Sequence, residues 1–282
     1  MKLSTSTSRI ERNFGLKETV KMIAEAGFDA IDFSACYEEY YTGTYDKEFY
    51  LEIKKYAEDK GVYFNQSHAP FSSSFTNEEE TKKRHGEIVT AMKNASYLGV
   101  ETIIVHPCQH LTYYEEGNKE KLFECNMNFY KSFISYCEEY GIKIAVENMW
   151  QYPKMISHST CSRPEEFIKY VDEIGSPWVV SCLDIGHSVL CREDPCEFIR
   201  KLDYRLTNLH VHDVDGIDDL HTLPFFGITD WNGVMKTLKR INYKGELTYE
   251  ANGFLADKPV ELYQDYLKLM AQTGRYLISL AQ

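Results

Sequence analysis

The stretch LTNLHVHDVDGIDDLH, residues 206–221, gathers His210, His212 and His221 with four aspartates where an apolar run becomes polar. Imidazole and carboxylate groups without thiolates are ligands that suit Zn, Mn, Co or Fe, whereas a set made only of oxygen ligands would favour Mg or Ca. The stretch therefore predicts a divalent-metal site. A metal held there could act as a Lewis acid on a bound substrate.

Eight short β-rich runs alternate with longer runs that have the apolar spacing of helices. The β-rich runs are LSTST, FDAIDFS, VYFNQSH, VETIIVH, IKIAVEN, WVVSCLD, LTNLHVHD and GELTYEA, and the helices are expected at 16–26, 46–60, 78–97, 118–140, 164–173, 195–201, 230–241 and 259–279. Gly27, Gly61, Gly99 and Gly141 each follow a helical run, where a C-cap glycine is expected. Eight such units predict an α/β fold, a (β/α)8 TIM barrel that forms a single domain over residues 1–282.

Strand alternation predicts which side chains point into the barrel. In IKIAVE, the side chains of Ile142, Ile144 and Val146 share one face, and Glu147 ends the opposite, inward face. The same count places further metal-ligand types at the inward ends of the other strands: His68, His106, Asp184, His210 with His212, and Glu250. Active sites of TIM barrels lie at the carboxyl ends of the strands, so these residues should converge on one pocket.

A buried ion-pair network is the structural alternative for Glu147, Asp184, His210 and Glu250. Such a network is costly to desolvate and would call for arginines at neighbouring strand ends, where the sequence has none. Cys182 lies two residues before Asp184 on the same face and is expected in the core, one layer deeper. The strand ends are therefore better explained as metal ligands.

The amino-acid composition limits which binding partners and which cellular compartment are expected. The net charge of −12 makes nucleic acid an unlikely partner, because its binding relies on Lys and Arg that neutralise phosphates. There is no apolar run long enough to cross a membrane, and the eight cysteines form no CxxC pair. We expect a cytoplasmic protein with reduced thiols and no membrane partner.

The chain resembles the xylose isomerase-like TIM barrel superfamily, which includes sugar isomerases, ketose 3-epimerases, inosose dehydratases and the endonuclease IV branch of abasic-site nucleases. The resemblance covers essentially the whole chain and rests on the order of VHPCQH, VENM, LDIGH, LHVHD, DDLH, GITDW and TYEANG. It implies that Glu147, Asp184, His210 and Glu250 form a four-ligand metal centre. It also implies possible further ligands that would complete a three-metal cluster: His68, His106, His187, Asp219 and His221.

Two segments decide between the branches. ENMWQYP and DIGH resemble the sugar-type members, whereas endonuclease IV carries ENTAGQG and DTCH at these places. In LPFFGITDW, Phe225 stands where that branch has glycine and Thr229 where it has an aliphatic residue, so the loop is expected to suit an unusual substrate.

The resemblance implies a metal-dependent isomerase or epimerase that acts on a sugar, sugar phosphate or inosose through an enediolate, with one to three Zn, Mn or Co ions; a dehydratase of the same family stays open. Glu147 and Glu250 are the expected acid and base. His187 would orient a substrate hydroxyl, and the other expected substrate contacts are His68, His212, Trp150 and Phe71. Two alternatives remain: a three-zinc phosphodiesterase acting on abasic-site DNA, and an inactive sugar-binding barrel. The substrate's identity and a homo-oligomeric state are left open.

Overall fold

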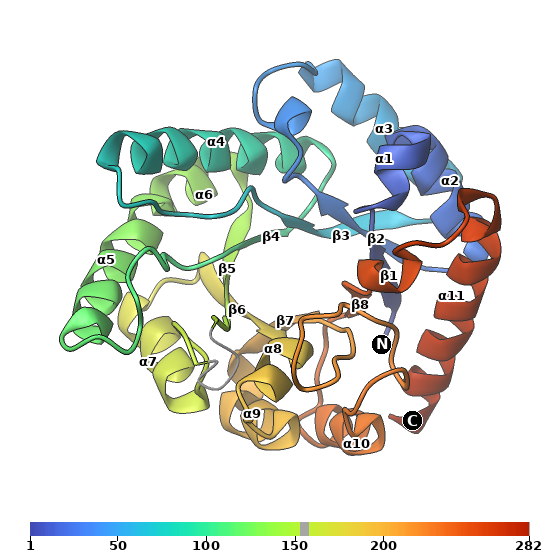
Figure 1. The fold of residues 1–282 in the computed structure, drawn as a ribbon. Coiled ribbons are helices and arrows are strands. Elements are labelled where there is room, and N and C mark those ends of the chain that lie inside the picture. The colour runs from blue at the N-terminus through green and yellow to red at the C-terminus, as the bar shows by residue number, and fades with distance from the viewer. Residues whose placement is uncertain (153–157, 282) are drawn as a thin grey trace.

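A closed barrel of eight parallel strands forms the centre of the computed structural model, which describes residues 1–152 and 158–281 (Figure 1). The strands are β1 (Leu3–Ser6), β2 (Ala30–Ser34), β3 (Tyr63–His68), β4 (Thr102–Val105), β5 (Lys143–Glu147), β6 (Val179–Asp184), β7 (Leu206–His210) and β8 (Leu247–Tyr249). Neighbours in sequence pair in order from β1 to β7, and β8 pairs with β1. A parallel bridge between Val211 and Tyr249 closes the ring between β7 and β8. The predicted TIM barrel is confirmed.

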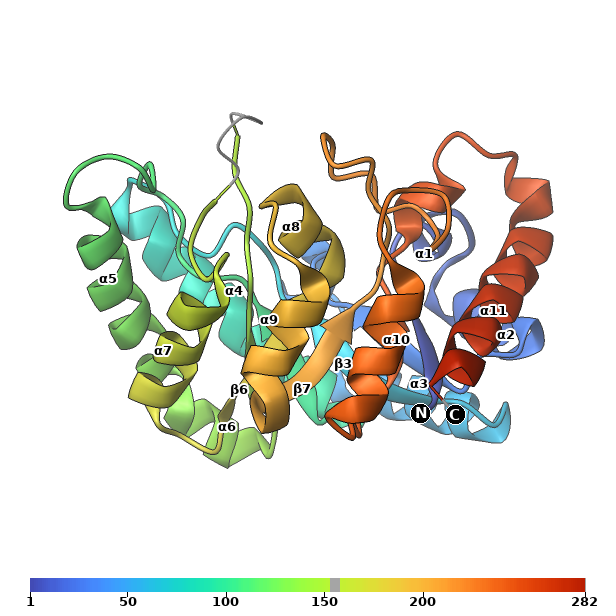
Figure 2. The ribbon, with the colours of Figure 1, turned by 90° about the horizontal axis from the view of Figure 1, so that it is seen from below.

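Helices surround the barrel as an outer layer (Figures 1 and 2). They are α1 (Ile10–Phe14), α2 (Leu16–Ala26), α3 (Lys47–Asp59), α4 (Glu78–Tyr97), α5 (Asn118–Ser132), α6 (Ile134–Tyr140), α7 (Pro164–Ile174), α8 (Ile185–Leu190), α9 (Pro195–Leu202), α10 (Trp231–Arg240) and α11 (Tyr263–Leu280). Four short 3-10 helices, η1 (Glu38–Tyr40), η2 (Asp203–Arg205), η3 (Asn252–Leu255) and η4 (Val260–Leu262), complete the described elements. None of the helices in the described residues combines the length and apolar character that a membrane crossing requires.

Two of the predicted helices differ from the observed ones, and the short helices α1 and α8 were not predicted. The helix expected over 118–140 is divided at Phe133, which ends α5 and precedes α6. Phe133 is fully buried and stacks on His85 of α4, so tertiary packing accompanies the break, and no helix-breaking residue marks it in the sequence. The last helix begins at Tyr263 rather than at 259, because residues 260–262 form η4.

The strands separate two kinds of interior. Ile144 and Val146 pack outward into the large apolar core beneath the helices, whereas Ala145 and Cys182 join Ile104 in a small cluster inside the barrel. Polar side chains in the barrel are hydrogen-bonded to one another: Asn65 accepts from the Ser4 hydroxyl at 2.7 Å and donates to Thr248 at 3.1 Å, and Asn208 donates to Gln66 at 3.0 Å. The alternation predicted for the fifth strand and the core position of Cys182 are confirmed.

Candidate metal centre

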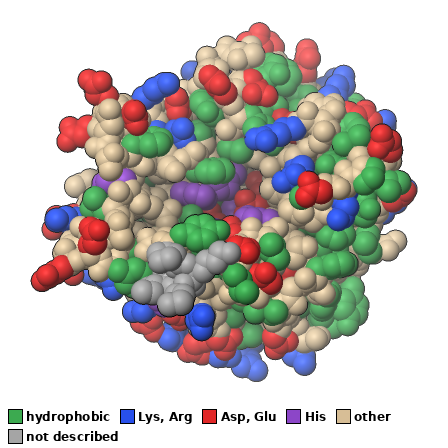
Figure 3. All heavy atoms as spheres, in the orientation of Figure 1, with side chains coloured by type: hydrophobic (Ala, Val, Ile, Leu, Met, Phe, Trp, Pro, Cys, Tyr) green, Lys and Arg blue, Asp and Glu red, His purple; other side chains and the backbone are tan. Residues whose placement is uncertain are grey.

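Histidine and carboxylate side chains meet at the carboxyl ends of the strands, in the hollow at the barrel mouth (Figure 3). β3 ends at His68, β5 at Glu147, β6 at Asp184 and β7 at His210. His106 and Glu250 directly follow β4 and β8. His187 comes from α8, whereas Asp219 and His221 come from the loop after β7. Each of these residues belongs to at least one group whose ligand atoms lie within 4.8 Å of one another.

The central group consists of Glu147, Asp184, His210 and Glu250. Nδ1 of His210 lies 2.9 Å from Oε1 of Glu147, 3.2 Å from Oε2 of Glu250 and 4.0 Å from Oδ2 of Asp184. Three carboxylates from three strands therefore face one imidazole nitrogen. Because the chain supplies these groups from rigid strand ends, the donors are positioned before any ligand binds.

A second group lies on the His68 side of the centre. Nε2 of His68 and Nε2 of His106 are 3.0 Å apart, and Nε2 of His106 is 3.2 Å from Oε2 of Glu147. His68 also forms a group with His210 and Glu250. Glu147 and Glu250 are therefore shared between neighbouring groups.

A third group joins His187, His212, Asp219 and His221. Oδ2 of Asp219 is 3.0 Å from Nε2 of His221 and 3.5 Å from Nε2 of His187. Nδ1 of His221 is 3.8 Å from Oε2 of Glu250, which links this group to the central one. The structure thus brings every predicted ligand into one of these neighbouring groups at the barrel mouth, and their roles as ligands remain predictions.

The chemistry of this pocket fits a bound cation. Oε2 of Glu147, Nε2 of His210 and Oδ1 of Asp219 are buried without a hydrogen-bond partner. The ion pairs that the described residues give to Glu147, Asp184, Asp219 and Glu250 are all with histidines, with no Lys or Arg among them. Buried carboxylates this close to one another require positive charge, and the mixed nitrogen and oxygen donors suit Zn, Mn or Co.

Protonation states follow from this crowding of acids and imidazoles. Burial alone would lower the pKa of His210 and of His187, but the surrounding carboxylates hold both well above the ordinary value. The pKa of His221 rises to about 9, because Glu250 and Asp219 outweigh its burial. Burial alone would raise the pKa of Asp219, but His187 and His221 bring it below its ordinary value. Protons on His187, His210 and His221 therefore supply positive charge beside the carboxylates, and a metal would displace them.

His212 lies beyond the end of β7, although the sequence placed it on that strand. Its Nε2 donates to Asp184, and its ring stacks on His221 with centroids 4.0 Å apart. A Cβ at Gly186 would come within 2.1 Å of the His212 ring, so the glycine in LDIGH leaves room for this imidazole. Nothing in the local sequence predicts this role of Gly186, because the imidazole that it accommodates follows a different strand.

Three further polar residues of the site region were not predicted from the sequence. Asn148 accepts from the backbone N–H of Asp184 at 2.7 Å and donates to its carbonyl at 2.9 Å, which fixes the strand end. Asp32 of β2 is buried without a hydrogen-bond partner, and burial raises its pKa to about 6. Asp213 accepts from the Thr229 hydroxyl at 2.8 Å and from Trp231 at 2.8 Å. Asn148 directly follows β5, so its position could have indicated it, whereas Asp32 lies in the middle of β2 and Asp213 three residues beyond β7.

The loop with the sequence LPFFGITDW was expected to suit an unusual substrate, and its two unusual residues make contacts within the protein. The hydroxyl of Thr229 holds Asp213, which is a structural role. Phe225 keeps the glycine-like φ of 76°, and its exposed ring contacts Tyr276 of α11. Thr229 and Phe225, the two residues that depart from the resembled pattern, therefore both anchor the loop to the rest of the protein.

The two aromatic residues expected to contact the substrate, Phe71 and Trp150, lie beside these groups. The Phe71 ring is 54% exposed and stacks on His106 with centroids 5.2 Å apart, and it also contacts His68. The indole N–H of Trp150 donates to Oδ2 of Asp219 at 3.2 Å. Both aromatic residues therefore border the pocket from different loops.

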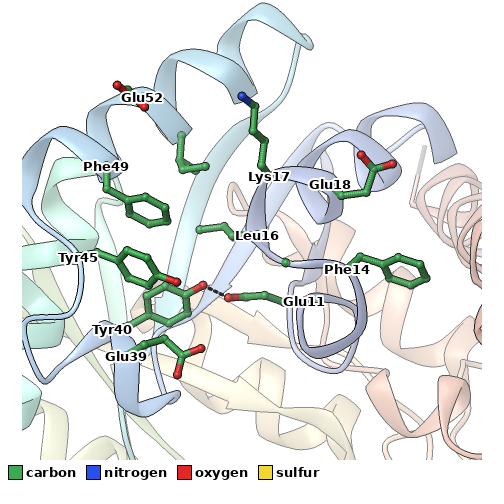
Figure 4. A pocket seen from close by; sticks show the side chains of 12 residues that line it. Glu11, Phe14, Leu16, Lys17, Glu18, Glu39, Tyr40, Tyr45, Phe49 and Glu52 are labelled. Atoms are coloured by element: carbon green, nitrogen blue, oxygen red, sulfur yellow. Dashed lines mark hydrogen bonds between the residues drawn. The ribbon is translucent and has the colours of Figure 1, made fainter.

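A separate cavity of about 340 Å³ lies outside the barrel mouth, between α1, α2 and α3 (Figure 4). Its wall includes the stacked rings of Tyr45 and Phe49 and the buried Glu11, which accepts from the Tyr40 hydroxyl. Burial raises the pKa of Glu11 to about 7, against the opposing effect of its hydrogen bonds. None of the predicted metal ligands lines this cavity.

Comparison with known proteins agrees with this architecture. Residues 20–273 match the family model of the xylose isomerase-like TIM barrel, and the chain belongs to this family. An uncharacterized protein of Methanocaldococcus jannaschii is 28% identical over 90% of this chain and 86% of its own length. The D-psicose 3-epimerase of Enterocloster bolteae is 24% identical over 83% of this chain and 76% of its own length. The crystal structure of the IOLI protein with a bound zinc atom superposes with a TM-score of 0.78 at 17% identity, covering 100% of this chain and 99% of that one.

Proposed function

We propose that the protein is a divalent-metal-dependent isomerase or epimerase that acts on a sugar, sugar phosphate or inosose through an enediolate. The observation that carries the proposal is the approach of Glu147 and Glu250 to the same nitrogen of His210, from strands on either side of β6 and β7. Two carboxylates that face one small site can act on two faces of a bound sugar.

Glu147, Asp184, His210 and Glu250 would hold the metal, which is Zn, Mn or Co. When bound, the cation supplies Lewis acidity to a substrate carbonyl and the adjacent hydroxyl, which makes the neighbouring carbon–hydrogen bond more acidic. The possible additional ligands are His68, His106, His187, Asp219 and His221, so that one to three ions could be accommodated.

The chain's own residues would move the proton. Burial alone would raise the pKa of Glu147, but His210 and His106 hold it well below its ordinary value, so this side chain is an ionised base. Glu250, protonated beforehand, would give a different proton to the opposite face of the substrate, which inverts the carbon when the substrate is epimerised. The two carboxylates would exchange these roles in the reverse direction. His187, His68 and His212 would contact substrate hydroxyls, and Trp150 and Phe71 would exclude water.

The comparisons support this reading at the level of the family. One relative is a D-psicose 3-epimerase, and the IOLI protein shares the fold and has a bound zinc atom. A carbohydrate is therefore the proposed small-molecule partner. The finer choice among isomerase, epimerase and dehydratase depends on the substrate.

A three-zinc phosphodiesterase acting on abasic-site DNA is the second candidate. The group of His187, His212, Asp219 and His221 favours it, because it offers ligands beyond those of a single-metal centre. The acidic 3-10 helix η1, with Glu38 and Glu39, and the net charge of −12 oppose it, because they would repel a DNA backbone.

Hydrogen exchange tests the choice. The purified protein would be incubated with Mn, Co or Zn and a panel of ketoses, ketose phosphates and inososes in deuterated water. Deuterium should enter the carbon next to the carbonyl of at least one substrate. Nicking of abasic-site DNA at physiological salt, with no exchange in any carbonyl sugar, would establish the second candidate instead.

A further inference from the structure

A further pocket, separate from the cavity beside Glu11, opens on the same rim of the barrel as the metal centre. It has a volume of about 350 Å³ and is lined by Ser8, Arg9, Arg12, Asn13, Tyr37, Asn252 and Tyr263. These residues follow β1, β2 and β8, which are neighbours in the barrel. The pocket therefore lies across the loops at the carboxyl ends of three adjacent strands.

Two arginines in this pocket lack acidic partners. Among the described residues, neither Arg9 nor Arg12 forms an ion pair with a carboxylate. In contrast, Arg84, Arg205 and Arg275 each pair with an acid. On a chain with a net charge of −12, two unpaired guanidinium groups in one pocket form a local positive site. Figure 3 shows Lys and Arg side chains beside the central hollow, on the side where Figure 1 places α1.

Tyr37 contacts the side chain of Arg12 and the backbone of Arg9. The Arg12 guanidinium lies over the Tyr37 ring, 4.8 Å from its centroid. The Tyr37 hydroxyl accepts from the backbone N–H of Arg9 at 3.1 Å and lies 3.4 Å from the Ser8 hydroxyl. Asn13 donates to the Arg9 carbonyl at 2.8 Å, and these contacts hold Arg9 at a φ of 62°, a conformation that residues with a Cβ rarely adopt. The fold therefore positions the Arg12 guanidinium and the backbone of Arg9, and neither guanidinium is paired with an acid among the described residues.

Asn252 joins this pocket to the metal centre. It follows Glu250 by two residues, so the Cα atoms of the two can be no more than about 7 Å apart. Oδ1 of Asn252 is buried without a hydrogen-bond partner, and its amide nitrogen has no partner among the described residues. An amide whose polar atoms are unused, next to the arginines, can turn its N–H groups toward an anion.

We propose that Arg9, Arg12, Ser8 and Asn252 form a phosphate subsite, so that the substrate of the neighbouring centre is a phosphorylated ketose. The substrate class rests on the proposed isomerase or epimerase function, whereas the anion site does not. Guanidinium groups bind phosphate oxygens with paired hydrogen bonds, and the Ser8 hydroxyl and the Asn252 amide add neutral donors. A monosaccharide that places its phosphate here would present its carbonyl end toward Glu250.

A single phosphate group fits this pocket better than a nucleic-acid backbone. Only two unpaired arginines line it, and the nearby η1 carries Glu38 and Glu39. An extended phosphate backbone would need a row of basic groups, which a small metabolite does not need.

Binding of inorganic phosphate tests the subsite directly. Titration calorimetry on the full chain with its metal would compare the wild type, the double variant R9Q+R12Q and the control K236Q+R240Q on α10. Both variants remove two positive charges, but Lys236 and Arg240 are exposed and far from the pocket lining. We expect the dissociation constant to rise at least tenfold in R9Q+R12Q and to stay within twofold of the wild type in the control.

Turnover tests the substrate class separately. R9Q+R12Q should raise KM for a ketose phosphate at least tenfold and leave KM for the matching unphosphorylated ketose unchanged. Equal phosphate binding in the wild type and R9Q+R12Q, or no saturable binding in the wild type, would overturn the subsite. An arginine-dependent loss of abasic-DNA nicking in place of ketose turnover would also overturn it. Phosphate binding that depends on the arginines, without hydrogen exchange in any ketose, would refute the proposed function and keep the anion site.

Discussion

Nε2 of His212 lies 3.0 Å from Oδ1 and 2.9 Å from Oδ2 of Asp184, so one imidazole holds both oxygens of a predicted metal ligand. Both side chains are fully buried, and Nδ1 of His212 has no hydrogen-bond partner. The imidazole thus fixes the orientation of the carboxylate that must face the central group. His212 is better described as a residue that positions Asp184 than as a bystander in the H-x-H sequence.

Replacing His212 should weaken metal binding without abolishing it. His212→Ala is expected to lower metal affinity by about 10- to 100-fold, the usual effect of removing a group that orients a ligand. His212→Asn keeps a side-chain donor and should recover part of the loss. Competition with a chelator measures the affinities, and an unchanged affinity in His212→Ala would show that Asp184 needs no such support.

Replacing Asp184 itself should weaken metal binding more than replacing His212 does. Asp184→Ala is expected to lower bound metal and the thermal stability of the metal-loaded protein together, because a ligand that binds the native state stabilises it. Asp265→Ala, on the exposed side of α11, is the control and should change neither. Elemental analysis and thermal melts with and without chelator provide the readout. Metal content equal to the wild type in Asp184→Ala would exclude this residue as a ligand.

The period-two pattern made the ends of the strands predictable. β3, β5 and β6 end at His68, Glu147 and Asp184, where the sequence placed the inward side chains, because a strand buried on both faces leaves little freedom of register. The ranges of the helices were predicted for a similar reason, since most carry a clear apolar face. The site's ligand types were therefore visible before the fold was known.

Contacts between distant loops were not predictable in this way. The break at Phe133 accompanies stacking on His85, and the Asp213 carboxylate is satisfied by Thr229 and Trp231 from a loop many residues later. Local propensity has no information about such partners, because they are set by packing of the complete barrel. The same holds for the pocket around Arg9, whose lining comes from both ends of the chain.

Replacing Glu250 should separate chemistry from metal binding. Glu250→Gln keeps an oxygen that can face the cation but removes the group that can take or give a proton. Hydrogen exchange in the substrate epimer from which Glu250 takes the proton should fall by at least about 100-fold, the low end of a general acid–base contribution, while bound metal falls far less. Mass spectrometry of the substrate and elemental analysis of the same sample measure the two effects. Equal losses of exchange and metal would mean that Glu250 serves only as a ligand.

The buried Glu11 should make stability depend on pH, independently of the metal centre. Burial, opposed by its hydrogen bonds to Tyr40 and Thr7, raises the pKa of Glu11 from 4.5 to about 7 in the folded protein. Between these values the folded state binds more protons than the unfolded state, so stability falls as pH rises through this window and is constant above pH 7 for this group. The total effect is about 3 kcal/mol at most.

Glu11→Gln keeps an acceptor for the Tyr40 hydroxyl and cannot ionise, so its free energy of unfolding should exceed that of the wild type increasingly from pH 4.5 to 7. Denaturant unfolding of both proteins at several pH values checks this, with Glu52→Gln at the rim of the same cavity as the control. Parallel pH profiles for the wild type and Glu11→Gln would show that Glu11 ionises without penalty.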